Sequence, residues 1–234
     1  MIALITGANR GIGYHIAKLL TERDVTVIVG ARDAEQGRRA AQELGARSVR
    51  LDVTSAESVS SAAEWIEEEY GLLDVLVNNA GVFLAQEDPA AAATPVEAMR
   101  ATYETNVFGV VAVTNAVLPL LRRAPAARIV NLSSGLGSLT RAGDPQDPFW
   151  ASNHLAYNSS KTALNMVTVV YAKELAGTPI KVNAADPGYC ATDMNAHAGH
   201  RTPEQGAAVA VRLALLGDDG PSGLCHDEDG VVPW

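Results

Sequence analysis

Tyr157 and Lys161 form a pair that could transfer a proton. On a helix, side chains four positions apart project from the same face, one turn from each other. A phenol has a reference pKa of about 10, and a nearby ammonium lowers that pKa because it favours the phenolate. Such a pair could give a proton to, or take one from, an alcohol or carbonyl oxygen. In an ordinary helix, by contrast, Tyr157 would pack on the core and Lys161 would be solvated.

A glycine-rich turn near the start of the chain could hold a dinucleotide. The apolar run Ile2–Thr6 predicts a strand, and it leads into Gly7, Gly11, Gly13 and an amphipathic segment. The glycines allow a tight turn, and the following helix N-terminus offers free N–H groups to a pyrophosphate. The alternative is a glycine-rich turn that binds nothing.

Arginines near the second predicted strand, Val25–Val29, favour a phosphorylated cofactor. An NAD site usually has a carboxylate here for the ribose 2′-hydroxyl. Asp33 is better interpreted as the cap of the next helix, with Gln36 at the third helical position. Arg32 and Arg10 could both face a 2′-phosphate, which two guanidinium groups suit. We therefore favour NADP(H) over NAD(H), with a solvated Arg32 as the alternative.

Two more predicted strands end in residues that could contact a flat ligand. Asp52, at the end of the strand predicted over 48–53, is positioned to accept a hydrogen bond from an adenine amine, although residues 54–57 also read as a helix cap. The strand 74–77 runs into Asn78, Asn79, Ala80 and Gly81, whose small side chains leave space for a ligand. The two amides could instead tie neighbouring strands together.

The middle of the chain carries one long predicted helix and one long loop. Residues 85–93 predict an exposed connection, and the helix after them contains Asn106, which could bend the backbone or hold a water. The strand Arg128–Leu132 ends at Ser133 and Ser134, at the edge where open α/β sheets bind ligands. The loop over 138–152 carries Phe149 and Trp150, and we interpret it as a substrate wall or else a surface flap.

The C-terminal third returns the chain to the same edge. A sixth strand over 180–184 leads into the turn Pro187–Gly188, and Thr192 could meet the cofactor's amide or phosphates. Residues 195–200 are small and polar. Thr202 caps a last helix, and residues 223–225 predict a seventh strand followed by a polar tail.

Composition sets broad limits on function. The 234 residues are 47% hydrophobic and only 5% aromatic, which suits a parallel sheet covered by helices. A net charge of −9 argues against binding to nucleic acid or an anionic membrane surface. Two cysteines are interpreted as reduced thiols of a cytoplasmic protein. His197 and His200 lack a third ligand nearby, so no metal is expected.

Taken together, these motifs resemble the short-chain dehydrogenase/reductase family. The matching pieces are Thr6–Gly13, Asn78–Gly81, Asn106, Ser134, Tyr157 with Lys161, and Pro187–Gly188, in the family's order. The Asn9–Arg10 pair and the sequence Ala31–Arg32–Asp33 most resemble the NADP-dependent carbonyl reductases.

The resemblance implies roles for these residues. Tyr157 would be the general acid in reduction and the base in oxidation, and Lys161 would lower its pKa and bind the nicotinamide ribose. Ser134 would hydrogen-bond the substrate oxygen, and Asn106 would hold a water that links Lys161 to solvent. The implied cofactor-binding residues are Gly7, Asn9, Arg10, Gly11, Ile12, Gly13, Arg32, Asp52, Val53, Asn79, Ala80, Gly81, Tyr157, Lys161, Pro187, Gly188 and Thr192.

The expected architecture is one doubly wound Rossmann domain over residues 1–234, with about seven parallel strands in the order 3-2-1-4-5-6-7. The expected activity is hydride transfer between NADP(H) and a small-molecule ketone, aldehyde or alcohol. The alternatives are an NAD-dependent sterol or sugar-alcohol dehydrogenase and a non-catalytic dinucleotide-binding regulator.

One departure from the family pattern concerns spacing. Tyr157 lies 23 positions after Ser134, which is longer than the usual separation. The added length could cover the helix that packs across a dimer axis in the family. The resemblance therefore implies a homodimer or homotetramer, and a monomer is also compatible with this sequence.

Overall fold

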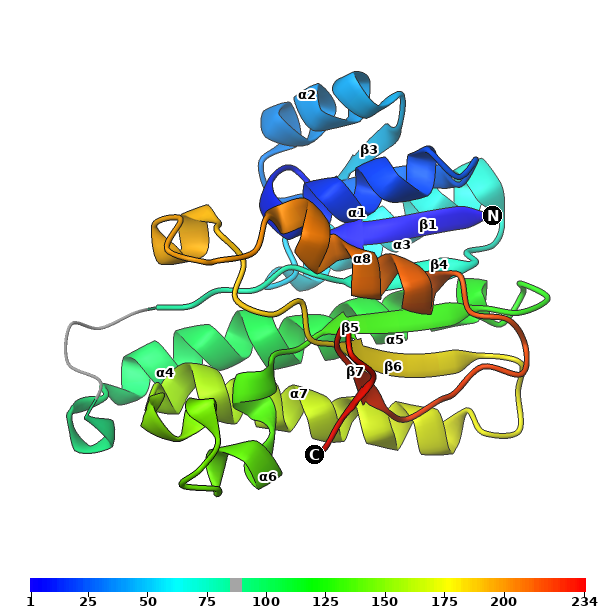
Figure 1. Ribbon diagram of the computed structural model, residues 1–234. Coiled ribbons are helices and arrows are strands. Elements are labelled where there is room, and N and C mark those ends of the chain that lie inside the picture. The colour runs from blue at the N-terminus through cyan, green and yellow to red at the C-terminus, as the bar shows by residue number, and fades with distance from the viewer. Residues whose placement is uncertain (85–89) are drawn as a thin grey trace.

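The computed structural model describes residues 1–84 and 90–234, and it places one eight-stranded sheet between two layers of helices (Figure 1). The strand order is β3-β2-β1-β4-β5-β6-β7-β8. The first seven strands are parallel, and β8 pairs antiparallel with β7. The doubly wound Rossmann sheet expected from the sequence is confirmed. The eighth strand was not expected, because the C-terminal segment had been interpreted as a polar tail.

Element bounds follow the predicted pattern closely. The strands are β1 (Ile2–Thr6), β2 (Thr26–Ala31), β3 (Arg47–Arg50), β4 (Val75–Asn78), β5 (Arg128–Leu132), β6 (Lys181–Ala185), β7 (Cys225–His226) and β8 (Val231–Val232). The α-helices are α1 (Gly11–Thr21), α2 (Ala34–Leu44), α3 (Ala56–Tyr70), α4 (Val96–Tyr103), α5 (Gly109–Leu121), α6 (Leu139–Ala142), α7 (Leu155–Glu174) and α8 (Pro203–Ala214). Short 3₁₀ turns cover η1 (Ala91–Ala93), η3 (Gly135–Gly137), η4 (Pro148–Ala151) and η5 (Asp193–Asn195), and a π-helical segment, η2 (Glu104–Phe108), joins α4 to α5.

Alternation along the strands divides the core into two layers. In β1, Ala3 and Ile5 face one cluster, which includes residues of α1 and α8. Leu4 faces the other cluster, which includes residues of α3, α5 and α7. Because successive strand side chains point to opposite faces, a strand buried on both sides must be apolar throughout. This explains why strand segments of the sequence such as residues 2–5 are continuous runs of aliphatic residues rather than alternating apolar and polar ones.

Two of the three expected helix caps are confirmed, and one is shifted. The Asp33 side chain accepts hydrogen bonds from Glu35 N and Gln36 N at the start of α2. Thr202 and Gln205 form a capping box at the start of α8. At α3 the cap is Ser55 rather than Thr54, because Thr54 is held by the Asp52 carboxylate instead, at 2.7 Å from its hydroxyl.

The helical stretch Val96–Leu121 has 26 residues and a mean hydropathy of 1.4 in its most apolar window. By length and composition alone it could cross a membrane. However, 56% of that window is buried inside the protein, as in a core helix. The expected connection over 85–93 lies partly outside the described residues, and its last part forms η1.

The segment between Ser134 and Tyr157 is structured rather than a plain loop, since it contains α6 and η4. The C-terminal residues pack against it: Ser138 Oγ donates to Pro233 O at 2.6 Å and Thr140 N donates to Trp234 O at 3.0 Å. Met166 of α7 remains exposed, so the added length does not cover that part of the helix.

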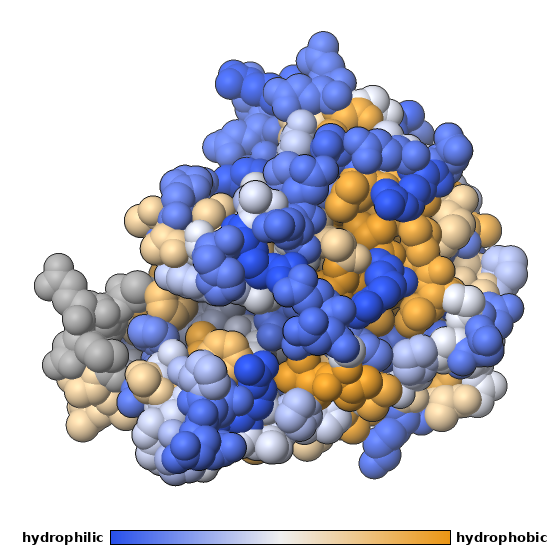
Figure 2. All heavy atoms as spheres, in the orientation of Figure 1, coloured by the Kyte–Doolittle hydropathy of each residue, from blue (hydrophilic) through white to orange (hydrophobic). Residues whose placement is uncertain are grey.

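Figure 2 shows the face that carries α1 and α8, where apolar side chains gather beside charged ones. A shallow hollow there is lined in part by Leu19, Ala208, Val211 and Leu215, together with Arg23 and Glu204. The catalytic motifs lie elsewhere, at the carboxyl edge of the sheet, where the loops after β1, β4, β5 and β6 meet.

Candidate active site

The glycine turn after β1 has the backbone that a dinucleotide cradle needs. Gly7 and Gly11 have φ values of 64° and 58°, which favour glycine. A Cβ added to Gly13 would lie 2.4 Å from Asn79 Nδ2, so no larger residue fits there. Arg10 at the N-cap of α1 makes no side-chain capping bond, and the first N–H groups of the helix are therefore left for an anion.

The two asparagines after β4 support the sheet edge. Asn78 Nδ2 donates to Asn131 Oδ1 at 2.9 Å, which ties β4 to β5. Asn79 Nδ2 donates to Thr6 O at 2.8 Å and to Gly7 O at 3.1 Å, which ties β4 to the glycine turn. Their amides therefore have the structural role that the sequence left open, and direct contact of Asn79 with a cofactor remains a prediction.

At the adenosine end of the cradle, the predicted residues are only partly together. The hydrogen bond from the Thr54 side chain lowers the pKa of the Asp52 carboxyl most, and the charge of Arg32 also lowers it. Arg32 itself is exposed at the end of β2. Arg10 instead forms an ion pair with Asp193, at 2.5 Å. Asn9 Nδ2 donates to Gln36 Oε1 at 2.9 Å. The structure therefore directs Arg10 toward the segment after β6, which the sequence did not indicate.

Asn106 lies in the π-helical segment between α4 and α5, where the regular α-helical hydrogen-bond pattern is interrupted. Its amide accepts from Val82 N at 2.8 Å and donates to Val82 O at 3.0 Å and to Ser160 Oγ at 3.1 Å. A Cβ on Gly81 would lie 3.4 Å from Asn106 Oδ1 and 3.7 Å from Lys161 Nζ. Asn106 thus holds the chain after β4 beside Lys161, and Gly81 lies between the two side chains, within van der Waals reach of both.

Tyr157, Ser134 and Lys161 converge at the carboxyl edge. The Tyr157 hydroxyl faces the Ser134 side chain, and Lys161 Nζ lies 5.5 Å from the centroid of the Tyr157 ring. Lys161 is 6% exposed and donates to Leu132 O at 2.7 Å. The helical spacing therefore brings the pair to one face, as the sequence predicted.

Ser133, the residue before Ser134, is hydrogen-bonded away from the site. Ser133 Oγ donates to Asn165 Oδ1 at 2.5 Å inside the core. Ser134 accepts only from Leu136 N on its own loop and faces Tyr157. The geometry therefore supports Ser134, the second residue of the pair, as the hydroxyl that meets a substrate.

The pKa directions differ from the simplest expectation. Burial, followed by the charge of Asp186, raises the pKa of Tyr157 to about 12, although the bond with Ser134 lowers it. Burial lowers the pKa of Lys161 to about 8, and Asp186 raises it. The expected lowering of the Tyr157 pKa by Lys161 is absent from this structure, because the ammonium is drawn to the Leu132 carbonyl and burial dominates both groups.

Three further residues lie at this site: Thr192, which the sequence predicted, together with Phe83 and Asp186. Phe83 stacks edge to face on Tyr157 and on His154, with centroids at 5.0 and 4.9 Å. Asp186 is buried directly before the Pro187–Gly188 turn. Thr192 lies against the glycine turn, since a Cβ on Gly11 would be 3.8 Å from its methyl group. Asp186 was not predicted as a site residue, and its only signal in the sequence was its place directly after a predicted strand.

These features fit a dinucleotide. The glycine turn, the open start of α1, Gly81 and the turn at Gly188 line one edge of the sheet. The fold and site together define a nucleotide-dependent oxidoreductase that carries a tyrosine–lysine–serine constellation.

Comparisons with known proteins agree. The short chain dehydrogenase family matches residues 1–203. Short-chain dehydrogenase anuI of Penicillium roqueforti is 38% identical, over 100% of this chain and 96% of that protein. Carbonyl reductase [NADPH] 1 of Bos taurus is 33% identical, over 100% and 98% of the two chains. The crystal structure of NADPH-bound carbonyl reductase from chicken fatty liver is 27% identical, with a TM-score of 0.86 over 99% of this chain and 98% of that one.

The chain belongs to the short-chain dehydrogenase/reductase family. It is accordingly an oxidoreductase that acts on small-molecule carbonyl or alcohol substrates with NAD(P)(H).

Proposed function

We propose that this protein is an NADPH-dependent carbonyl reductase. The observation that carries the proposal is the contact between Tyr157 and Ser134 beside Lys161. A phenol with a pKa of about 12 is protonated at neutral pH, and the protonated form is the one that can donate to a carbonyl oxygen. The bound nicotinamide would supply the hydride, Ser134 would hold the substrate oxygen, and Tyr157 would deliver the proton.

The proposed preference for NADPH rests on the end of β2. The Asp33 carboxylate accepts from Glu35 N at 2.9 Å and from Gln36 N at 3.0 Å, so it is occupied as a helix cap. Arg32, next to it, is exposed at the position where a ribose 2′-substituent is read in Rossmann folds. A guanidinium there attracts a phosphate, whereas a free carboxylate would repel it.

We expect Arg32→Ala to weaken NADPH binding about tenfold or more, because a charge-assisted contact contributes roughly 1.5–3 kcal/mol. NADH binding should change little, since NADH lacks the 2′-phosphate. Calorimetry with both cofactors measures this. Arg38→Ala is the matched control, because Arg38 is also exposed but pairs with Glu35 along α2. Equal losses for NADH and NADPH in Arg32→Ala would refute the assignment.

Support for a substrate wall comes from the segment between Ser134 and Tyr157. A Cβ on Gly135 would lie 2.6 Å from the Phe149 ring, so Phe149 packs directly beside the Ser134 loop. The Arg141 guanidinium carbon lies over that ring, 4.2 Å from its centroid, and Arg141 pairs with Asp147 at 3.0 Å. This packing fixes an apolar surface next to the proposed reacting oxygen, and it favours apolar ketones or aldehydes.

Phe149→Ala should reduce kcat/KM for apolar ketones about tenfold, because it removes apolar contact beside the substrate. The Kd of NADPH should stay unchanged. Trp150→Ala is the control, since Trp150 is adjacent but 51% exposed. A panel of ketones and aldehydes, followed by loss of NADPH absorbance, tests both the activity and the wall. If Phe149→Ala altered only NADPH affinity, the wall would have been assigned wrongly.

A further inference from the structure

Asp186 is a buried carboxylate with no assigned role in the reaction. It follows β6 directly, and its residue is 5% exposed. Its backbone N–H donates to His226 O at 2.7 Å, which continues the pairing of β6 with β7 and fixes the backbone. The side chain is therefore held at the carboxyl edge of the sheet. Burying a charge is unfavourable unless hydrogen bonds compensate for the lost water.

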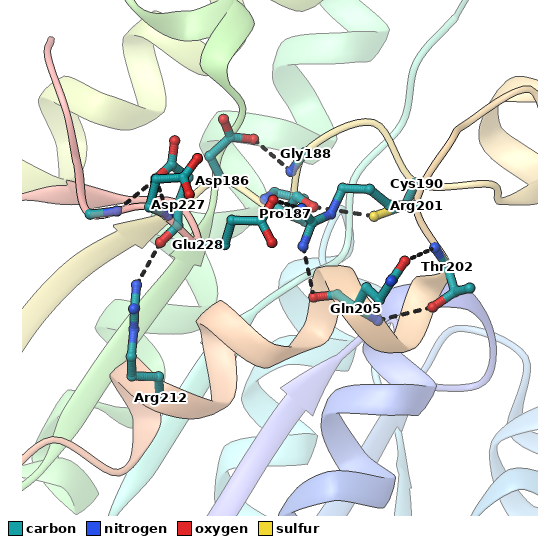
Figure 3. A network of polar contacts seen from close by, with 12 residues as sticks. Asp186, Pro187, Gly188, Cys190, Arg201, Thr202, Gln205, Arg212, Asp227 and Glu228 are labelled. Atoms are coloured by element: carbon teal, nitrogen blue, oxygen red, sulfur yellow. Dashed lines mark hydrogen bonds and ion pairs between the residues drawn. The ribbon is translucent and has the colours of Figure 1, made fainter.

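The carboxylate connects two loops of the site. Gly188 N donates to Asp186 Oδ1 at 3.0 Å across the turn after β6, as Figure 3 shows. The N–H of Gly135, which follows Ser134, faces the same carboxylate and lowers its pKa. A Cβ on Gly135 would lie 2.8 Å from Asp186 Oδ2, so the contact leaves no room for a side chain there.

We propose that Asp186 is a positioning residue of the catalytic centre. Its carboxylate ties the Ser134–Gly135 loop to the Pro187–Gly188 turn, and its negative charge acts on the Tyr157–Lys161 pair. The role combines geometry and charge, because the same hydrogen-bonded carboxylate holds the loops and contributes to the electrostatics of the pair.

The charged surroundings support this role. The charge of Asp186 raises the pKa of Tyr157 and of Lys161, in each case after the effect of burial. For Asp186 itself, burial raises the pKa most, the Gly188 N–H lowers it, Asp227 raises it, and the Gly135 N–H and Arg141 lower it. The other titratable groups that it faces are the thiols Cys190 and Cys225, whose pKa values are raised mainly by burial. The positive groups that interact with its charge are thus Lys161 and Arg141.

Titration of Lys161 in the cofactor-free protein tests the charge directly. We expect Asp186→Asn to shift the Lys161 titration, followed by NMR of protein labelled at the lysine ε-carbons, to lower pH by about half a unit or more. The chain has four lysines, and loss of one signal in Lys161→Met assigns the resonance. The basic limb of kcat/KM for ketone reduction should shift in the same direction. Asp186→Ala gives the same test if the amide variant does not fold.

Asp227→Asn is the matched control. Asp227 lies in the same network of polar contacts (Figure 3). Its carboxylate accepts hydrogen bonds from Asp229 N and Gly230 N. Its charge acts on Asp186 rather than on the Tyr157–Lys161 pair. Asp227→Asn should therefore leave the pH at which Lys161 titrates unchanged. An unchanged Lys161 titration in both Asp186 variants would overturn the proposal, even if turnover fell, because a purely structural loss lowers kcat without moving the titration. The pH dependence of kcat/KM rests on the proposed reductase activity, whereas the NMR titration of Lys161 does not. A failure of this proposal can therefore be distinguished from a failure of the proposed function.

Discussion

Tyr157→Phe should lower kcat for carbonyl reduction by about 10³-fold, within the range that removal of a general acid produces. The substitution removes the hydroxyl that faces the Ser134 side chain. It keeps the ring, which stacks on Phe83 at 5.0 Å. NADPH binding should therefore be preserved. Steady-state turnover and fluorescence titration with NADPH measure the two quantities separately.

Tyr171→Phe provides the matched control on the same helix. Its hydroxyl donates to Asn115 Oδ1 at 2.7 Å, away from the site. Losing that bond should cost about 1 kcal/mol of folding stability and leave kcat unchanged. Full activity in Tyr157→Phe would remove this residue from the chemistry, and equal losses in both variants would indicate damage to α7 rather than to catalysis.

Lys161→Met should lower kcat/KM by about 10²-fold or more, because it removes the only ammonium that the structure describes beside Tyr157. The folding stability of Lys161→Met, unlike its activity, should not fall. Burial lowers the pKa of Lys161 from 10.5 to about 8, so holding the charged form inside the protein costs about 3 kcal/mol. Methionine removes that cost but leaves Leu132 O without its donor, which costs about 1–3 kcal/mol.

We therefore expect Lys161→Met to be as stable as the wild type, or more stable, at pH 7. The unfolded state binds the extra proton between the folded pKa of about 8 and the unfolded value of 10.5. Wild-type stability should accordingly rise relative to the variant as the pH increases through that interval. Below the interval, the full cost of burying the charged Lys161 should be present. Urea unfolding at pH 7 and at higher pH measures this. Lys173→Met, which removes an exposed lysine from α7, should show no such trend.

Much of the site was predictable because its backbone is set locally. The Gly7–Gly13 turn, the Asp33 cap and the spacing of Tyr157 and Lys161 all depend on residues within a few positions of each other. Turn conformation, capping and helical periodicity act over that range. The boundaries of β3 and the cap of α3 shifted because Asp52 holds Thr54, a competing local bond that the pattern did not indicate.

The parallel sheet, the glycine cradle and the identity of the proposed proton donor could all be predicted from the order of the amino acids. The partners of the charged and polar groups, by contrast, depend on how distant segments pack together. Arg10 pairs with Asp193, which lies 183 positions away, and Ser133 is distinguished from Ser134 by a core partner on α7. Asp186 lies beside the Ser134–Gly135 loop because β5 and β6 are neighbours in the sheet. Burial and the sum of nearby charges determine a pKa, and both depend on segments that are distant along the chain.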